Sequence, residues 1–168
     1  MFTIQPAGNE AIPTIQQLAN QTWAVAYKDI LDQAQMKYML ETLYSTTTLE
    51  YQHNQLHFQS ILAIDDGKPI GFASYSPSEN KPGIFRLHKI YILPGQQGKG
   101  IGQSLLNYVI ADMKTKGATI LELNVNRQNK ARTFYEKLGF IVIGEEDIPI
   151  GNGYFMNDYV MQKTILSS

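Results

Sequence analysis

The 168-residue chain contains no cysteine, and this absence excludes several kinds of chemistry. Without thiols, a protein forms neither disulfides nor thiolate metal sites, and it cannot carry an acyl group on a cysteine during a transfer reaction. The histidines show no metal-ligand spacing, and we expect His53 and His57 on the surface. We therefore expect no metal site.

Strong positive charge and long apolar runs are also absent. The net charge is −1 and the pI about 6.3, whereas proteins that track nucleic-acid phosphates are usually strongly basic. No stretch approaches the ~20 apolar residues of a membrane-spanning helix. The N-terminal residues lack the basic start and apolar run of a signal peptide. We expect a soluble, cytoplasmic protein that binds neither nucleic acid nor membranes.

The spacing of apolar residues predicts an α+β fold, a mixed sheet with helices on its faces, in one domain spanning residues 1–168. Helices are expected after Asn9, around residues 36–44 with the run 45–48 ending that helix, and at 101–113 and 131–138. Strands are expected at 2–6, 58–64, 70–75, 84–93, 120–125, 140–143 and 159–161. Turns are expected at 65–68 and 151–156.

The most informative segment is residues 94–103, Pro-Gly-Gln-Gln-Gly-Lys-Gly-Ile-Gly-Gln, which joins a predicted strand to a predicted amphipathic helix. Glycines let the backbone turn tightly and approach a ligand without clashes from Cβ atoms. Free N–H groups at the start of a helix, together with the helix dipole, favour an anion such as a phosphate. The alternative interpretation is a glycine-rich turn with no ligand.

Two other phosphate-binding loops fit this segment poorly. A Walker A loop needs a lysine followed by serine or threonine, but Lys99 is followed by Gly100. A dinucleotide-binding fingerprint has the spacing G-x-G-x-x-G and opens an early βαβ unit. Here Gly98, Gly100 and Gly102 have the spacing G-x-G-x-G, late in the chain and after a predicted hairpin. The pattern favours neither a Walker A loop nor a dinucleotide-binding loop.

The segment resembles motif A of the GNAT acetyltransferase family, Gln/Arg-x-x-Gly-x-Gly/Ala, which Gln97, Gly100 and Gly102 match position by position. Residues 87–94 look like the fourth strand of that family, and residues 131–140 look like its motif B, Ala-x-x-Phe/Leu-Tyr-x-x-x-Gly-Phe. The two motifs are separated by one helix and one strand, as in the family. The resemblance implies a mostly antiparallel central sheet whose fourth and fifth strands splay apart.

The same resemblance implies that acetyl-CoA is the cosubstrate. Main-chain amides of the loop would hold its diphosphate, one strand would pair with its pantetheine arm, and an asparagine before motif B would contact that arm. The residues implied are Gln97, Gly98, Lys99, Gly100, Ile101, Gly102 and Gln103 in the loop, Ile90, Tyr91 and Ile92 in the strand, and Asn129, with Gln128 as the alternative.

Two residues are implied for the chemistry. Tyr135 of motif B corresponds to the family's general acid, which protonates the departing CoA thiolate, and its alternative role is packing in the core. His88 stands on the fourth strand where many family members carry a glutamate base. An unperturbed histidine pKa of ~6.5 suits a proton acceptor at neutral pH. A relay through water and a purely structural histidine stay open.

The implied activity is transfer of an acetyl group to a primary amine by direct attack, since no cysteine exists to carry it. The layout is similar to that of bacterial spermidine/spermine N-acetyltransferases, so the acceptor is expected to be a small-molecule amine such as a polyamine, or a protein N-terminus. A non-catalytic acyl-CoA-binding regulator with the same fold is the alternative. The sequence leaves open whether the chain forms a homodimer.

Residues outside the two motifs are expected to have structural rather than catalytic roles. Trp23, Tyr27, Tyr38 and Tyr44 lie in the predicted N-terminal helices, where aromatic residues more often fill the core than line a pocket. Asp158 precedes the last predicted strand and is expected to be a solvated surface charge, with attraction of a cationic amine as the alternative.

Overall fold

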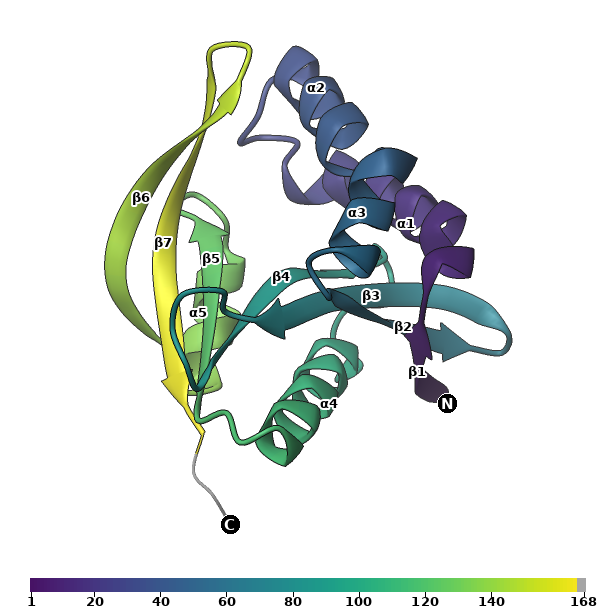
Figure 1. The fold of residues 1–168 in the computed structure, drawn as a ribbon. Helices are drawn as coiled ribbons and strands as arrows, with labels where there is room; N and C mark the ends of the chain where they lie inside the picture. Colours follow the sequence, from purple (N-terminus) through teal and green to yellow (C-terminus); the bar gives the residue numbers. More distant parts are fainter. Residues whose placement is uncertain (166–168) are drawn as a thin grey trace.

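The computed structural model describes residues 1–165, which form one seven-stranded sheet with helices on both of its faces (Figure 1). The helices are α1 (Ile12–Ala26), α2 (Gln33–Leu43), α3 (Thr46–Asn54), α4 (Ile101–Thr115) and α5 (Ala131–Lys137), with a short 3-10 turn, η1 (Asn9–Ala11), before α1. The strands are β1 (Phe2–Ala7), β2 (Gln59–Asp65), β3 (Lys68–Pro77), β4 (Ile84–Ile92), β5 (Ile120–Asn126), β6 (Ile141–Gly151) and β7 (Tyr154–Thr164).

The sheet has the order β1-β2-β3-β4-β5-β7-β6, and only the pair β4 and β5 is parallel. That pair is also the shortest, because it extends only from Ile84 opposite Ile120 to Leu87 opposite Leu123. Beyond this point the two strands separate. The predictions of an α+β fold, a mostly antiparallel sheet and splayed fourth and fifth strands are therefore confirmed.

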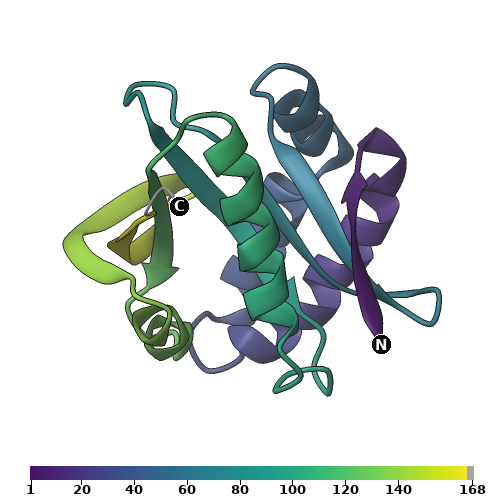
Figure 2. The same cartoon turned by 90° about the horizontal axis from the view of Figure 1, so that it is seen from below.

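Two apolar cores lie on opposite faces of the sheet. One core packs α4 and α5 against the sheet and includes Leu105, Val109 and Leu123. The other packs α1, α2 and α3 against the opposite face and includes Ile15 and Phe72. Seen from below, α4 crosses one face while the N-terminal helices lie behind the sheet (Figure 2). The sheet thus divides the molecule into an α4 side and an α1–α3 side, and the gap between β4 and β5 connects the two.

The N-terminal region contains one helix more than the sequence indicated. The run 45–48 ends α2 as expected, but the Ser45 side chain then accepts a hydrogen bond from the Thr48 amide (3.1 Å) and so begins α3. This helix was missed because Leu49 is its only buried residue, so its apolar periodicity is weak.

The C-terminal hairpin is longer than expected. Strands β6 and β7 pair along most of their length, and only Asn152 and Gly153 remain as the turn, so residues 154–156 belong to a strand and not to the expected turn. Figure 1 shows the tip of this hairpin beside α2. Tyr38 of α2 donates a hydrogen bond to the Ile150 carbonyl (2.9 Å) and packs its ring against Tyr154.

Candidate active site

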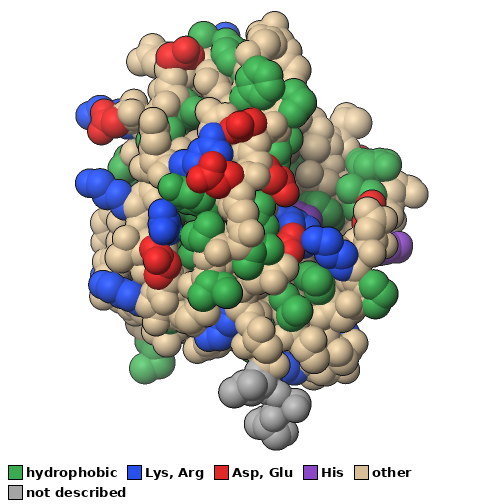
Figure 3. Space-filling view, turned by 90° about the vertical axis from the view of Figure 1, so that its left-hand side faces the viewer, with side chains coloured by type: hydrophobic (Ala, Val, Ile, Leu, Met, Phe, Trp, Pro, Cys, Tyr) green, Lys and Arg blue, Asp and Glu red, His purple; other side chains and the backbone are tan. Residues whose placement is uncertain are grey.

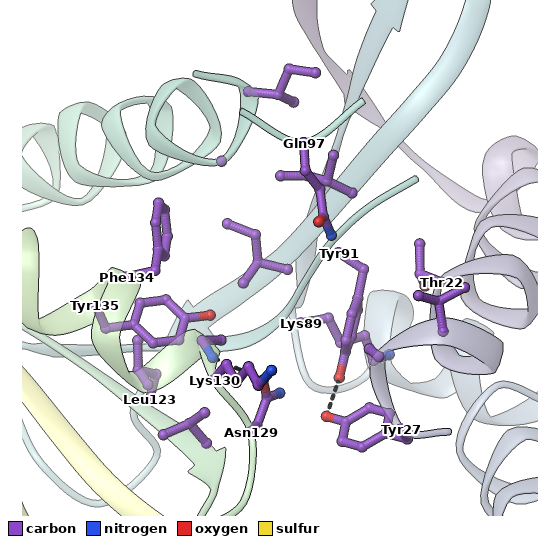
Figure 4. A pocket seen from close by; sticks show the side chains of 18 of the residues that line it. Thr22, Tyr27, Lys89, Tyr91, Gln97, Leu123, Asn129, Lys130, Phe134 and Tyr135 are labelled. Atoms are coloured by element: carbon purple, nitrogen blue, oxygen red, sulfur yellow. Dashed lines mark hydrogen bonds between the residues drawn. The ribbon is translucent and has the colours of Figure 1, made fainter. Parts of the chain in front are cut away.

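A cavity of about 860 Å³ opens where β4 and β5 separate (Figure 4). Its walls come from the C-terminal part of α1, from β4 and β5, from the glycine loop with the start of α4, and from the start of α5. These elements include every loop, strand and helix that the sequence predicted as part of a site. The predicted residues that line the cavity are His88, Ile90, Tyr91, Ile92, Gln97, Gly98, Gly100, Ile101, Gly102, Gln103, Gln128, Asn129 and Tyr135.

The glycine loop presents free amides at the start of α4. Gly98 and Gly100 have φ angles of +83° and +79°, a left-handed conformation that side chains disfavour, and Gly100 is the N-cap of the helix. Ser104 is the first amide of α4 that donates to a helix carbonyl, that of Gly100 (3.0 Å). The amides of the first helical turn are therefore available to an anion in the cavity.

Gly102 allows Ile92 of β4 and Phe134 of α5 to pack closely against the start of α4. A Cβ atom at this position would lie 3.1 Å from both the Ile92 Cδ1 and the Phe134 Cζ atoms, so a side chain here would push against both walls. Lys99 is the exception in the loop, because it is not on the cavity wall and its ammonium donates to the Gln96 side chain (3.0 Å).

Strand β4 offers a free backbone edge to the cavity. On one side Ile90, Tyr91 and Ile92 pair with β3, opposite Ala73, Phe72 and Gly71. On the other side the pairing with β5 has already ended at Leu87. The exposed edge can therefore bind an extended chain as an additional strand.

Tyr135 belongs to both the core and the cavity. Its ring packs against Phe134 and Phe140, with centroids 5.4 Å and 5.7 Å apart, and only 7% of the residue is exposed. Its hydroxyl points into the cavity (Figure 4). Burial raises the pKa of Tyr135, so the phenol stays protonated at neutral pH.

His88 lies at the wall in a β-bulge. Ser74 pairs with Lys89 and Tyr75 with Leu87, so His88 has no partner on β3. Its ring stacks on Phe58, and its Nε2 atom is 2.7 Å from the Ser76 hydroxyl. Desolvation by these neighbours, and then the positive charges of Arg86 and Lys89, lower the pKa of His88 to about 3. The lowered pKa favours a neutral imidazole at neutral pH.

The asparagine before α5 has a structural role in addition to its place on the wall. The Asn129 side-chain oxygen accepts a hydrogen bond from the Ala131 amide (2.9 Å) and so closes the turn that precedes the helix. Gln128 also lines the cavity, so both predicted alternatives lie at the site. Figure 4 shows Asn129 between Tyr135 on one side and Tyr27 on the other.

The profile of the Acetyltransferase (GNAT) family matches residues 15–140, which is more than half of the chain. The chain belongs to this family. A crystal structure of PaiA N-acetyltransferase from Thermoplasma acidophilum in complex with coenzyme A has a TM-score of 0.81 and 27% identity, covering 98% of this chain and 99% of that one. Acetyl-CoA is accordingly the cosubstrate of this GNAT protein.

Several similar proteins have names that include an acceptor, among them the following two. The spermidine N(1)-acetyltransferase of Thermoplasma acidophilum is 28% identical over 159 residues, covering 92% of this chain and 91% of that protein. The ribosomal protein bS18-alanine N-acetyltransferase of Haemophilus influenzae is 37% identical over 83 residues, covering 49% of this chain and 55% of that protein. The similarity to spermidine acetyltransferases that the layout suggested is thus confirmed.

The aromatic residues of the N-terminal helices divide into two groups in this GNAT protein. Trp23 and Tyr44 are buried in the core, as expected. Tyr27 is buried in the same core but also lines the cavity, where its hydroxyl lies 3.0 Å from the hydroxyl of Tyr91 on β4 (Figure 4). This pair joins α1 to the free part of β4. The sequence contained no signal for it, because the two tyrosines are 64 positions apart.

Asp158 is buried, and the expectation of a solvated charge is wrong. Only 2% of the residue is exposed, because β7 lies between β5 and β6 and places the side chain beside Asn124 and Glu146. Its Oδ2 atom accepts a hydrogen bond from Asn124 (3.3 Å), while its Oδ1 atom has no partner among residues 1–165. Burial, and then the charge of Glu146, raise the pKa of Asp158.

Two arginines near Asp158 are paired with acidic residues. Arg86 donates to Glu122 and to Asn124, and Arg127 pairs with Glu145 and Asp147. Acidic and basic side chains lie intermixed on this side of the molecule (Figure 3). Among residues 1–165 no three His, Cys, Asp or Glu side chains group as metal ligands, and none of the helices described is long and apolar enough to cross a membrane.

His53 is partly buried, contrary to the expectation that it lies on the surface. It belongs to the missed helix α3, where its ring contacts the side chains of Asn9 (2.9 Å) and Ser60 (2.7 Å). His57 is exposed, as expected. Neither histidine lines the cavity.

Proposed function

We propose that this protein transfers the acetyl group of acetyl-CoA to a primary amine, of a small molecule or a peptide N-terminus, by direct attack and without an acyl-enzyme. The observation that carries the proposal is the meeting of two features in one cavity. Free amides at the start of α4 lie at one end, and the Tyr135 hydroxyl points into the space where β4 and β5 separate.

Each part of the wall has a defined task. The amides from Gly98 to Gln103 bind the diphosphate, which the dipole of α4 also favours. The free edge of β4 at Ile90 to Ile92 aligns the pantetheine arm. With this arm in place, the thioester lies in the gap, where an amide of β4 donates to its carbonyl oxygen and stabilises the charge that develops there.

Tyr135 supplies the proton that the leaving thiolate needs. Burial keeps the phenol protonated at neutral pH. The phenol donates its proton only when a strong base forms beside it, and the thiolate that leaves CoA inside the cavity is such a base. Phe134 and Phe140 hold the ring in place, so the hydroxyl is positioned before the reaction begins.

His88 is proposed as the group that takes the proton of the attacking amine, directly or through water. The lowered pKa supports a neutral imidazole that is ready to accept a hydrogen bond, but it also makes His88 a weak base. The proton therefore passes through His88 only briefly on its way to solvent, which the exposed part of the ring contacts.

The acceptor approaches from the side opposite α4. The glycine loop and α4 place the cofactor on one side of the sheet, so the open side of the gap is the α1–α3 side, where Tyr27 and Tyr91 lie. The names of two relatives give spermidine and an alanine of ribosomal protein bS18 as acceptors. Spermidine carries primary amines, and an alanine in a protein offers one when it is the N-terminal residue. Asp158 does not line the cavity, but it accepts a hydrogen bond from Asn124, which does, so its negative charge favours an ammonium group on this side.

The test is release of free thiol from acetyl-CoA, followed with a panel of amines that includes polyamines, amino acids and short peptides. Thiol release that depends on an amine, with the acetylated amine identified by mass spectrometry, supports the proposal. Tight CoA binding without thiol release for any amine would instead identify a non-catalytic acyl-CoA-binding regulator.

A further inference from the structure

Lys89 of β4 is a partly buried cation without a carboxylate partner. Its ammonium donates to the Gln52 side chain (2.7 Å) and lies 4.9 Å and 5.9 Å from the ring centroids of Tyr44 and Phe58. No carboxylate of residues 1–165 forms an ion pair with it, although the neighbouring Arg86 is paired with Glu122. The residue also lines the cavity.

The bulge at His88 is what turns this lysine toward the α1–α3 side. Before the bulge, Phe85 and Leu87 face the α4 side, and after it Ile90 and Ile92 do so. The alternation along β4 therefore slips by one residue, and Lys89 comes to share a face with Tyr91. Without the bulge, Lys89 would point into the apolar core below α4.

Its position on the strand places Lys89 beside the path of the acceptor. Pairing with β5 ends at Leu87, so Lys89 lies in the part of β4 that borders the gap. It faces away from α4 and the glycine loop, which hold the cosubstrate. A molecule that reaches the thioester from the α1–α3 side passes this ammonium.

A buried cation is costly unless an anion accompanies it. The aromatic rings and the Gln52 oxygen offset part of this cost, and burial still lowers the pKa of Lys89 to about 8, so the side chain remains largely charged at neutral pH. Burial and the charge of Lys89 lower the pKa values of His53 on α3 and His88 on β4, and burial raises the pKa of Tyr44, so none of these neighbours adds negative charge at neutral pH.

We propose that Lys89 binds an anionic group of the acceptor, and that the acceptor is an amine that also carries a carboxylate, as an α-amino acid does. The proposal rests on the proposed acetyl transfer and narrows its acceptor. An amino acid offers a carboxylate to the ammonium of Lys89, which lines the cavity and forms no ion pair among residues 1–165. A polyamine brings only positive charge toward Lys89 and is repelled by it.

The experiment compares amino acids with the amines that lack their carboxylate, leucine with isopentylamine and phenylalanine with phenethylamine. For each pair, the ratio of the two kcat/KM values is measured in the wild type, Lys89→Met, Lys89→Arg and the control Lys37→Met, which changes an exposed lysine of α2. The wild type should favour the amino acid. Lys89→Met should lower the ratio at least tenfold through a higher KM for the amino acid. Lys89→Arg and Lys37→Met should leave the ratio as it is in the wild type.

An unchanged ratio in Lys89→Met would overturn the proposal, as would a wild type that prefers the amines or spermidine. If no amine releases thiol, the proposed function itself fails, and calorimetry then decides the role of Lys89. With CoA present, the wild type should bind N-acetylleucine at least tenfold more tightly than N-isopentylacetamide, and Lys89→Met should bind both equally. Equal binding by the wild type contradicts an anion site.

Discussion

Tyr135 shows how one side chain serves packing and chemistry together. Its ring fills the core between Phe134 and Phe140, while its hydroxyl is left to the cavity. The two interpretations that the sequence offered for this residue are therefore compatible. An experiment distinguishes the packing role from the chemical role only if it removes the hydroxyl and keeps the ring.

Tyr135→Phe should lower kcat about 100-fold, since a positioned general acid contributes on this order. The Kd for CoA and the thermal stability should change little, because the ring packing is preserved. Steady-state kinetics and calorimetry check this, with the exposed Tyr51→Phe as the control. Turnover equal to that of the wild type would exclude the phenol as the proton donor.

His88 has a pH dependence that its lowered pKa determines. A group with an ordinary pKa of 6.5 would lose activity as a base when the pH falls through that value. With a pKa of about 3, His88 stays neutral throughout an assay from about pH 5 to about pH 9. Its contribution to the rate should therefore not vary with pH in this range.

His88→Ala should lower kcat/KM by about 100-fold and by the same factor at each pH. The measurement is a pH profile of kcat/KM for the wild type and the variant, with exposed His57→Ala as the control. An inflection near the ordinary histidine pKa of ~6.5 that is present in the wild type and lost in His88→Ala would contradict the shifted pKa. A variant as fast as the wild type would remove His88 from the proton path.

At the scale of elements, the junction of the glycine loop and α4 has a conformation that only glycine adopts easily. Gly100 is its N-cap, with φ at +79°, and no atom lies within 4 Å of the place where a Cβ would stand. Gly67 in the turn between β2 and β3 has nearly the same φ, +75°, and equally open surroundings, but it lies outside the cavity. Gly67 is therefore a matched control for Gly100.

Gly100→Val and Gly67→Val should each destabilise the fold by about 1–2 kcal/mol, the cost of a left-handed conformation for a residue with a Cβ. Only Gly100→Val should also weaken CoA binding, by tenfold or more, because relaxing the strain turns the amides of α4 away from the diphosphate. Denaturation and calorimetry measure the two effects. Equal CoA affinity in both variants would show that the loop does not hold the diphosphate.

At the scale of the whole molecule, several elements together build the cavity that we propose holds the cosubstrate. The cavity walls come from α1, β4, β5, α4 and α5, so a bound CoA joins the two halves of the sheet across the gap where β4 and β5 no longer pair. Binding should therefore stabilise the complete fold rather than one segment.

CoA at about 100 times its Kd should stabilise the protein by about 2.7 kcal/mol. For a chain of this size, that corresponds to a rise in Tm of about 5–10 °C in a thermal unfolding measurement. Pantetheine, which lacks the diphosphate, should give a much smaller rise at the same concentration, because it leaves the amides of α4 unpaired. Equal Tm shifts for CoA and pantetheine would show that the diphosphate contributes little to the binding energy.

Much of the fold was predictable because local patterns report local structure. The apolar periodicity of α4, the Asp-Gly turn between β2 and β3 and the two motifs were all visible in the sequence. Helix α3 was not, since a single buried leucine leaves no periodic pattern. The length of the β6–β7 hairpin was also missed, because exposed residues along β6 obscure its strand pattern.

The sequence by itself determined the family and the cosubstrate, because these depend on short motifs, and it located the glycine loop that we propose binds CoA. Only the tertiary structure decided the burial of Asp158, the contact between Tyr27 and Tyr91, and the inward direction of Lys89. These features depend on which strands become neighbours and on a bulge that shifts one strand by a residue. Charge and pKa follow from such neighbours, which a linear pattern does not contain.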